Sequence, residues 1–389
     1  MTSADSKAQD RGFVDHISRR EFWIVAGASL LCSITVTHSS VVALALGREH
    51  YSLEQIGILL SITAIPVLLA TFLSGALTAR FGARGAMQFA MVFAALGVGS
   101  LAITRDYFWA ALVSRLIWGV GVGFFLPPTM VYVQSRLSQK HFVYLVSAFS
   151  ATIPLGLAIA PVMGEFVLDH YGVAAMFLIG ALPAVLGFLV TFALRPLEKP
   201  TGTRGFGIGS AAQGWHILPL CVLLVGGAHY GYAASYLAPA LAEHGTALGF
   251  FFVPMTIATV SSRIGAMRFL AGFHPRNLAG GGLAVSGLAL IVAAWEPTAA
   301  LAVASGLLLG FGNSMIYPVV SAWMGRNAPA HRRSGVQAIA ATAFYSGIYA
   351  TPWPETYLVA AFGFSVTQMV LGLAGLVVAL AIIGARTEG

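Results

Sequence analysis

Four ionisable side chains lie inside long apolar stretches of this 389-residue sequence: His38, Arg115, Glu165 and His229. A charged side chain at the centre of a membrane helix costs about 2.5–3.5 kcal/mol, so such residues face a protein interior or an aqueous cavity and mark functional sites by default. Histidine titrates near neutral pH, and a carboxyl group does so when burial and a nearby cation act on it in opposite directions. These residues predict proton exchange or the binding of a charged solute.

Arg115 shares a helix face with Gly119 and Gly123, four and eight residues later, and the glycines allow a neighbouring helix to come close. Glu165 is the one acid that we place inside a membrane span, near the end of that span. We interpret it as a proton carrier, and the alternative is an interfacial acid in contact with water, like Asp169.

Polar aromatic side chains form three stripes in the second half of the chain. His229, Tyr232 and Tyr236 recur at i, i+3 and i+7 of one helix, and two further pairs recur at i, i+4. A tyrosine combines an apolar ring with one hydroxyl, which suits an amphipathic organic ligand, although such stripes also pack or form interfacial belts. The predicted substrate-binding residues are His38, Arg115, His229, Tyr232, Tyr236, Asn313, Tyr317, Tyr345 and Tyr349.

The composition identifies an all-α membrane protein. Hydrophobic residues make up 58% of the chain and charged residues 9%, whereas soluble domains carry about 25% charged residues. Apolar stretches of about 20 residues, enough to span a bilayer, recur along the whole length. We predict twelve transmembrane helices over residues 22–46, 54–77, 85–103, 107–133, 142–168, 172–194, 216–240, 247–269, 278–295, 299–324, 335–353 and 361–385.

The net charge of +7 follows the predicted topology and does not indicate nucleic-acid binding. Basic residues gather in the first tail and in every second connection: Lys7, Arg11, Arg19, Arg20, Arg80, Arg84, Arg136, Lys140, Arg195, Lys199, Arg204, Arg276, Arg326, Arg332 and Arg333. The other connections hold Arg48 and Arg105 and the acids Glu49, Asp169, Glu243, Glu296 and Glu355. Cytoplasmic loops are rich in Lys and Arg, so we expect both termini to lie in the cytoplasm. We expect the protein to lie in the cell inner membrane.

A shift of 191 residues superimposes backbone-shaping residues of the two halves. Gly119 falls on Gly310, Gly121 on Gly312, Pro127 on Pro318, Gly156 on Gly347 and Pro161 on Pro352; His38 falls on His229. Duplicated halves would keep a close helix approach or a kink at matching places. We predict two pseudo-symmetric six-helix bundles: a tail 1–21, a first bundle 22–194, a Pro- and Gly-rich linker 195–215, a second bundle 216–385 and a tail 386–389.

Three motifs resemble the major facilitator superfamily of secondary transporters. "GALTARFGARG" at 75–85 resembles the loop between helices 2 and 3 of that family, and Ala79 stands where the family usually has Asp. "RLIWGVGVG" at 115–123 resembles its helix 4 motif. "GLAIAPVMGEF" at 156–166 resembles the helix 5 motif associated with antiporters, with Ala160 and Glu165 at positions where glycine is common. The resemblance implies a gating loop that contains Gly75, Arg80, Gly82 and Arg84.

The same resemblance implies roles for three of the intramembrane residues. Arg115 would influence proton coupling or attract an anionic substrate group, and the alternative is a structural arginine that ties helix ends through backbone carbonyls. The first helix of each three-helix repeat lines the central cavity of the family, so His38 and His229 are expected to face one another. They would bind substrate or relay protons, pack as neutral hydrogen-bonded residues, or together hold a metal. Two histidines alone make a poor metal site, so we predict none.

The leading functional prediction is a secondary active transporter that moves a small organic solute by alternating access, as a proton-coupled exporter. Protons would bind at Glu165 or the histidines, with Arg115 altering their affinity. The runner-up is a proton symporter or facilitator that imports organic anions, and a third is a non-transporting assembly protein on a transporter fold. The sequence has no phosphate-binding Gly-rich loop and no Ser–His–Asp candidate set, so we predict neither enzyme activity nor a cofactor. The expected partners are the solute, protons and membrane lipid, and the chain is expected to be a monomer.

Overall fold

The computed structural model describes residues 19–136, 149, 151–196, 217–266, 273–295, 298–327 and 333–384, and every regular element in these ranges is a helix. Most of the predicted tails and of the linker at 195–215, and the first part of the span at 142–168, lie outside the described residues. The all-helical fold class is confirmed over the part of the chain that the structure describes.

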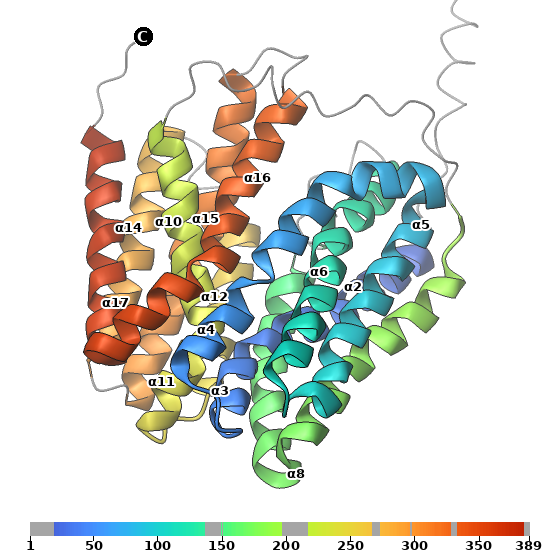
Figure 1. Ribbon diagram of the computed structural model, residues 1–389. Coiled ribbons are helices and arrows are strands. Elements are labelled where there is room, and N and C mark those ends of the chain that lie inside the picture. Colours follow the sequence, from blue (N-terminus) through green and yellow to red (C-terminus); the bar gives the residue numbers. More distant parts are fainter. Residues whose placement is uncertain are drawn as a thin grey trace, which may run out of the picture.

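The helices of the first half of the chain pack mainly against one another and are called the N-terminal group. They form the blue-to-green part of Figure 1. The elements are α2 Arg19–Thr37, the 3-10 turn η1 His38–Val41, α3 Val42–Gly47, α4 Leu53–Ser61, α5 Ala64–Thr104, α6 Phe108–Arg136, α8 Thr152–Val190 and the 3-10 turn η3 Thr191–Ala193.

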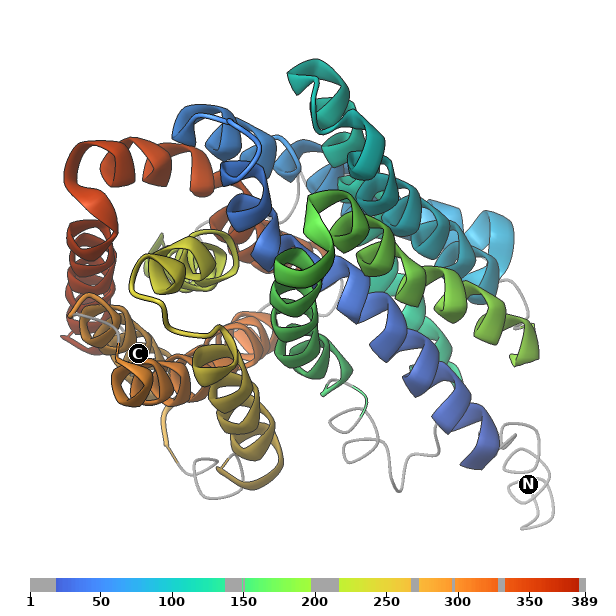
Figure 2. The same ribbon diagram turned by 90° about the horizontal axis from the view of Figure 1, so that it is seen from below.

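The helices of the second half are called the C-terminal group and lie beside the first group in both views (Figures 1 and 2). The elements are α10 Ile217–Ser235, α11 Leu237–Glu243, α12 Gly249–Ser261, the π-helical turn η4 Ser262–Ala266, α14 Pro275–Ala293, α15 Ala299–Asn327, α16 Arg333–Ala350 and α17 Pro352–Gly384.

Three long helices reverse direction at a glycine. Gly82 in α5, Gly172 in α8 and Gly363 in α17 have φ values of 73°, 82° and 79°, with extended ψ values of 163°, 178° and 173°. Only glycine adopts this backbone conformation readily, because a Cβ atom would clash. Gly172 and Gly363 are 191 residues apart, so the reversal recurs at the predicted offset. The end of the molecule that carries these two turns is called the predicted outer end.

Close helix contacts also recur at that offset. An added Cβ at Gly156 would lie 2.7 Å from Ser33, and one at Gly347 would lie 2.1 Å from the carbonyl oxygen of Leu224, which is 191 residues after Ser33. Glycine lets the two backbones approach at each place. The two groups therefore share their packing at matched positions.

Two helix breaks follow from prolines. Pro66 cannot donate to the carbonyl of Ile62, four residues earlier, and the chain turns at residues 62–63 between α4 and α5. Pro352 likewise cannot donate to Ile348, and the chain turns at Thr351 between α16 and α17. The predicted span 335–353 is thus too short at its end, because α17 continues as a helix to the turn at Gly363.

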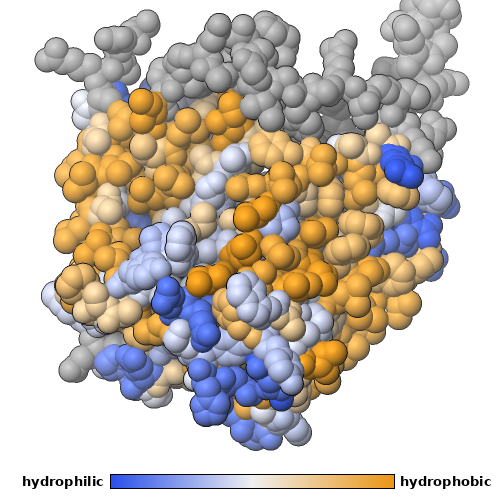
Figure 3. Space-filling model, viewed as in Figure 1, coloured by the Kyte–Doolittle hydropathy of each residue, from blue (hydrophilic) through white to orange (hydrophobic). Residues whose placement is uncertain are grey.

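The surface is that of a membrane protein. Figure 3 shows apolar side chains over most of the visible face, with polar residues gathered towards the predicted outer end. Large apolar side chains such as Leu69, Trp109 and Leu380 are 57%, 76% and 71% exposed. Among the described residues, eight stretches are long and apolar enough to cross a bilayer.

Gly310→Ala should destabilise the C-terminal group, because the new methyl carbon would lie 2.1 Å from the carbonyl oxygen of Met255. Overpacking of this kind costs about 1–3 kcal/mol. Thermal unfolding in detergent measures the change. The matched control is Gly281→Ala in α14, where nothing lies within 4 Å of the added carbon, and where alanine should stabilise the helix by about 0.5–1 kcal/mol. Equal melting temperatures for the two variants would contradict the packing argument.

Candidate functional site

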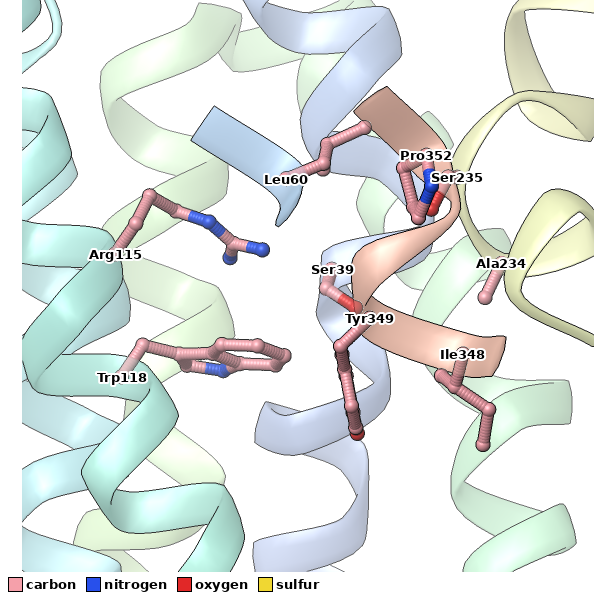
Figure 4. A pocket seen from close by; sticks show the side chains of 9 residues that line it. All are labelled: Ser39, Leu60, Arg115, Trp118, Ala234, Ser235, Ile348, Tyr349 and Pro352. Atoms are coloured by element: carbon pink, nitrogen blue, oxygen red, sulfur yellow. The ribbon is translucent and has the colours of Figure 1, made fainter. Parts of the chain in front are cut away.

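A small cavity with both polar and apolar lining lies where the two groups of helices meet (Figure 4). Its volume is about 20 Å³, which is room for about one water molecule. Both groups contribute to its wall, so a change in their separation would change its size. The lining residues are Ser39, Leu60, Arg115 and Trp118 from the N-terminal group and Ala234, Ser235, Ile348, Tyr349 and Pro352 from the C-terminal group.

The guanidinium of Arg115 is anchored at one edge and free at another. Its Nε donates to the carbonyl oxygen of Leu59 at 3.1 Å, and the helix break at residues 62–63 makes that carbonyl available, because Thr63 does not donate to it as it would in a continuous helix. The side chain is 2% exposed. Its Nη1 atom nevertheless has no hydrogen-bond partner in the described structure. Arg115 therefore ties a helix end and also presents an unsatisfied donor.

Trp118 completes the cationic side of the cavity and was not among the predicted site residues. Its ring lies under the guanidinium of Arg115, with 4.3 Å from Cζ to the ring centroid, and both side chains project from α6 towards Tyr349 (Figure 4). The Trp118 and Tyr349 rings meet edge to face, with centroids 6.1 Å apart. The indole Nε1 is buried without a partner. The available signal was the i, i+3 spacing from Arg115, which puts both residues on one face.

The expectation that His38 and His229 face one another is wrong. His229 is fully buried inside the C-terminal group, where Nδ1 lies 2.9 Å from the hydroxyl of Ser286 and Nε2 lies 3.0 Å from the carbonyl oxygen of Leu371. His38 is equally buried inside the N-terminal group, against Gly180 of α8, where an added Cβ would lie 2.5 Å from the ring. Neither ring lines the cavity.

Both histidines occupy a helix face that turns into their own group: His38 packs against α8, and His229 packs against α14 and α17. The spacing of apolar residues does not determine how a helix is rotated about its axis, and that rotation decides which way each ring points. Ser39, the residue after His38, lies on the side of the chain that reaches the cavity, and its role was not predicted from the sequence. The ring nitrogens of His38 form no hydrogen bond of normal geometry among the described residues, and the backbone of Met176 is a polar neighbour of the ring. Roles for both histidines in proton coupling or substrate binding stay predictions.

Most of the predicted aromatic stripes lie against neighbouring helices. Tyr236 donates to the carbonyl of Pro352 at 2.8 Å, and Asn313 donates to that of Gly226 at 2.8 Å. Of the predicted substrate-binding residues, only Arg115 and Tyr349 line the cavity. The remaining members are placed by contacts within the C-terminal group: Tyr232 with Phe364, Tyr317 with Phe344, and Tyr345 with Tyr349.

Glu165 joins the two groups outside the cavity. Its carboxylate oxygens lie 3.1 and 3.3 Å from the backbone nitrogen of Leu248, which precedes α12 and donates to them. A negative charge at a helix N-terminus is stabilised by the helix dipole. The observed contact thus gives Glu165 a positional role, and its predicted proton-carrying role stays a prediction.

The predicted outer end is closed by contacts between α4 and α17. The hydroxyl oxygen of Ser61 accepts the backbone N–H of Trp353 at 2.6 Å, and the hydroxyl of Tyr357 donates to Glu54 at 3.3 Å. Gly57 lies so close to Thr356 that an added Cβ would be 1.9 Å from its hydroxyl oxygen. The cavity is thus closed off by helices from both groups.

Comparison with known proteins assigns this arrangement to a family. Residues 22–274 match the Major Facilitator Superfamily. The chain belongs to this superfamily. Its helices superimpose on those of a D-xylose–proton symporter with a TM-score of 0.73 and 17% identity, over 94% of this chain and 97% of that one. A POT family transporter in complex with 5-aminolevulinic acid gives a TM-score of 0.76 with 12% identity, over 94% and 95% of the two chains.

Two curated superfamily relatives are similar in sequence. The niacin transporter NiaP of Acinetobacter baylyi is 29% identical over 137 residues, which are 34% of this chain and only 30% of that protein. The multidrug efflux protein YfmO of Bacillus subtilis is 23% identical over 343 residues, 85% of this chain and 84% of that protein. The chain is therefore a superfamily transporter and not an enzyme.

The superfamily loop between helices 2 and 3 is built around the turn at Gly82. Arg84 donates to the carbonyl oxygen of Leu194 at 2.9 Å, and its guanidinium lies over the ring of Phe192. Arg80 is exposed and lies over the ring of Phe81, and Gly75 is also exposed. These contacts stay within the N-terminal group, and a gating role for the loop stays a prediction.

His229→Ala should lower the stability of the C-terminal group, because it leaves the hydroxyl of Ser286 and the carbonyl of Leu371 without their partner. Loss of partners for buried polar groups costs about 1–3 kcal/mol. Thermal unfolding measures this, and His244→Ala, at the exposed end of α11, is the control. If both variants melt at the wild-type temperature, the packing role of His229 is wrong.

Gly57→Ala should prevent the predicted outer end from closing, because the methyl group would overlap Thr356. Hydrogen–deuterium exchange of residues 350–357 should become about tenfold faster or more, as the contact with α4 opens. The control is Gly47→Ala in α3, where nothing lies within 4 Å of the added carbon. Unchanged exchange in Gly57→Ala would show that contact between α4 and α17 does not close this end.

Proposed function

We propose that this chain is a proton-coupled secondary transporter for small organic anions with an aromatic or other planar group. The observation that carries the proposal is the pair of buried, unpartnered donors, Arg115 Nη1 and Trp118 Nε1, beside a cavity whose lining contains no acidic residue. A buried donor without an acceptor costs about 1–3 kcal/mol. A carboxylate supplies acceptors for such donors, and charge-assisted bonds to arginine are strong.

The aromatic side chains support a planar substrate. Trp118 and Tyr349 come from opposite groups and approach each other to a centroid distance of 6.1 Å. A flat ring between them would gain offset or edge-to-face contact in addition to the burial of its apolar area. The cavity of about 20 Å³ does not hold such a molecule, so binding would require the groups to separate on one side, as alternating access demands.

We also propose the predicted twelve helices in two six-helix bundles. Each of the three stretches that reverse at Gly82, Gly172 and Gly363 is 42 to 52 residues long, and about 20 residues span a bilayer. Each would supply two spans, and the short apolar helix Gly249–Ser261 with η4 would supply the last. Both termini would be cytoplasmic, in the cell inner membrane, with the chain a monomer.

Two similar proteins are linked by their names to carboxylic acids, which supports a carboxylate as the substrate. The partly matching niacin transporter is named for a pyridinecarboxylic acid, and one similar structure contains 5-aminolevulinic acid. The direction of transport rests on other features. The helix 5 motif at 156–166 and the match to a multidrug efflux protein favour proton-coupled export, and the anion-binding cavity suits import by symport equally well.

Arg115→Gln should raise the concentration of aromatic carboxylate needed for half-maximal transport by about tenfold or more, which is 1.4 kcal/mol of lost binding. Purified protein in liposomes with an imposed pH gradient would be tested with nicotinate and benzoate and with the neutral amides nicotinamide and benzamide. Arg48→Gln, which removes an exposed ion pair with Asp169, is the control and should transport like the wild type.

Three results of that experiment would overturn parts of the proposal. Transport of the amides and not the acids would remove the anion assignment. Acid transport that ignores the pH gradient would remove proton coupling. Equal transport by Arg115→Gln and the wild type would remove Arg115 from the substrate site. The orientation of the pH gradient that drives net uptake or net release of the acid shows the direction of transport.

A further inference from the structure

Glu355 is a buried acid in the C-terminal group that the sequence analysis placed in an outer connection. It lies in α17, three residues after Pro352 of the cavity wall, and is 2% exposed. Neither of its carboxyl oxygens has a hydrogen bond of normal geometry in the described structure, and the hydroxyl of Thr351 is close enough to interact with the carboxyl group. The expectation of a water-exposed loop acid is therefore wrong, because the helix continues past Pro352.

The hydroxyl groups near Glu355 are already used by backbone carbonyls. Thr351 donates to Gly347 at 2.6 Å, Thr356 donates to Pro352 at 2.9 Å, and Tyr236 also donates to Pro352. No lysine, arginine or histidine of the described chain forms an ion pair or hydrogen bond with the carboxyl group. An unpaired carboxylate is very costly to bury, so the neutral acid is the form that this closed arrangement accommodates.

Few other titratable groups face this part of α17. From α10 the phenols of Tyr232 and Tyr236 are within electrostatic range of Glu355. From α4 the only one is Glu54, which accepts the hydroxyl of Tyr357, and from α11 it is Glu243, which acts on Tyr232. All of these groups are neutral or negative in their ordinary charge states. None of them would hold Glu355 as a buried anion.

Packing does not require an acid at this place. The position 191 residues earlier is Gly164, where an added Cβ would lie 2.7 Å from Val41. In the N-terminal group, the position that corresponds to Glu355 is therefore closely packed although Gly164 has no side chain. The carboxyl group of Glu355 is an addition to the shared packing, which points to a functional role.

Helix α10 of the same group packs against the side of this turn that holds Glu355, through Tyr232 and Tyr236, and α4 of the other group covers the adjacent side. Trp353 and Tyr357, on either side of Glu355, bond to Ser61 and Glu54 of α4, and Thr356 contacts Gly57. When α4 separates from α17, this turn of helix loses its cover from the N-terminal group. Water would then reach the carboxyl group from the predicted outer end.

We propose that Glu355 is the proton-binding site of the transport cycle and that it exchanges its proton when the predicted outer end opens. The proposal rests on the proposed proton coupling. Protonation favours contact between α4 and α17, and by reciprocal linkage that contact favours the bound proton. A rise in outer pH removes the proton from the open form and disfavours closure. The coupled proton is thus held three residues from the wall of the substrate cavity.

Infrared difference spectroscopy tests the site without any substrate. The purified full-length protein should show the carbonyl stretch of a protonated carboxyl group, and this band should disappear as the pH is raised. Glu355→Gln should lack the band, and Glu165→Gln should retain it. A band that is unchanged in Glu355→Gln overturns the proposal.

The link to the predicted outer end needs a second variant. Ser61→Cys with Trp353→Cys, in a background without Cys32 and Cys221, allows a short bifunctional thiol reagent to tie α4 to α17. The tied protein should keep the band over the titrated pH range, and the untied protein should lose it. Identical titration of both forms would overturn exchange through this end.

Transport separates this proposal from the proposed substrate class. With nicotinate as the probe, Glu355→Gln should lose accumulation driven by a pH gradient, by about tenfold or more, and retain exchange of internal for external nicotinate. Gradient-driven transport at the wild-type level would overturn the role of Glu355 even if the band is lost. If the wild type transports no anion, the substrate proposal fails, and the two spectroscopic results still decide whether Glu355 binds the proton.

Discussion

The bond between Arg115 and the carbonyl oxygen of Leu59 sets the arrangement at the centre of this protein. Pro66 interrupts the helix, the interruption leaves the Leu59 carbonyl available, and the Arg115 guanidinium binds it from α6. The bond fixes the guanidinium over the ring of Trp118. One face of a buried cation is thereby satisfied by the protein, and another is left for an acceptor that the described residues do not supply.

The two halves share packing and differ in polar groups. Glycines at matched positions allow the same close approaches in both groups, and Gly172 and Gly363 turn the chain in the same way. The residue that corresponds to Arg115 is Gly306, and the residue that corresponds to Glu355 is Gly164. The two halves thus share a scaffold, and one half carries a cation and the other an acid. Each of these side chains stands at a position where the other half has a glycine.

The sequence predicted what depends on composition and regular spacing. The helical membrane fold and the superfamily followed from apolar length and from motifs with glycine and arginine. The directions of the His38 and His229 rings did not, because apolar spacing does not determine how a helix is rotated about its axis against its neighbours. The burial of Glu355 did not either, since a proline followed by an acid is typical of a helix end, and only the tertiary packing of α17 against α10 and α4 buries this turn.

In the proposed cycle, the cation and the acid would act on different steps because of where they lie. Arg115 lines a cavity that both groups form, so its electrostatic attraction is available to an anion whichever end is open. Glu355 is buried beside α10, and α4 covers the adjacent side of the same turn, so opening of the predicted outer end would change its access to water. An anion at Arg115 would hold the groups together through Tyr349, and a neutral Glu355 would hold α4 against α17. Both would stabilise the occluded form, so anion and proton would favour each other's retention, which is the linkage that symport requires. Export in exchange for protons would require the opposite sign, with the bound anion keeping α4 away from α17.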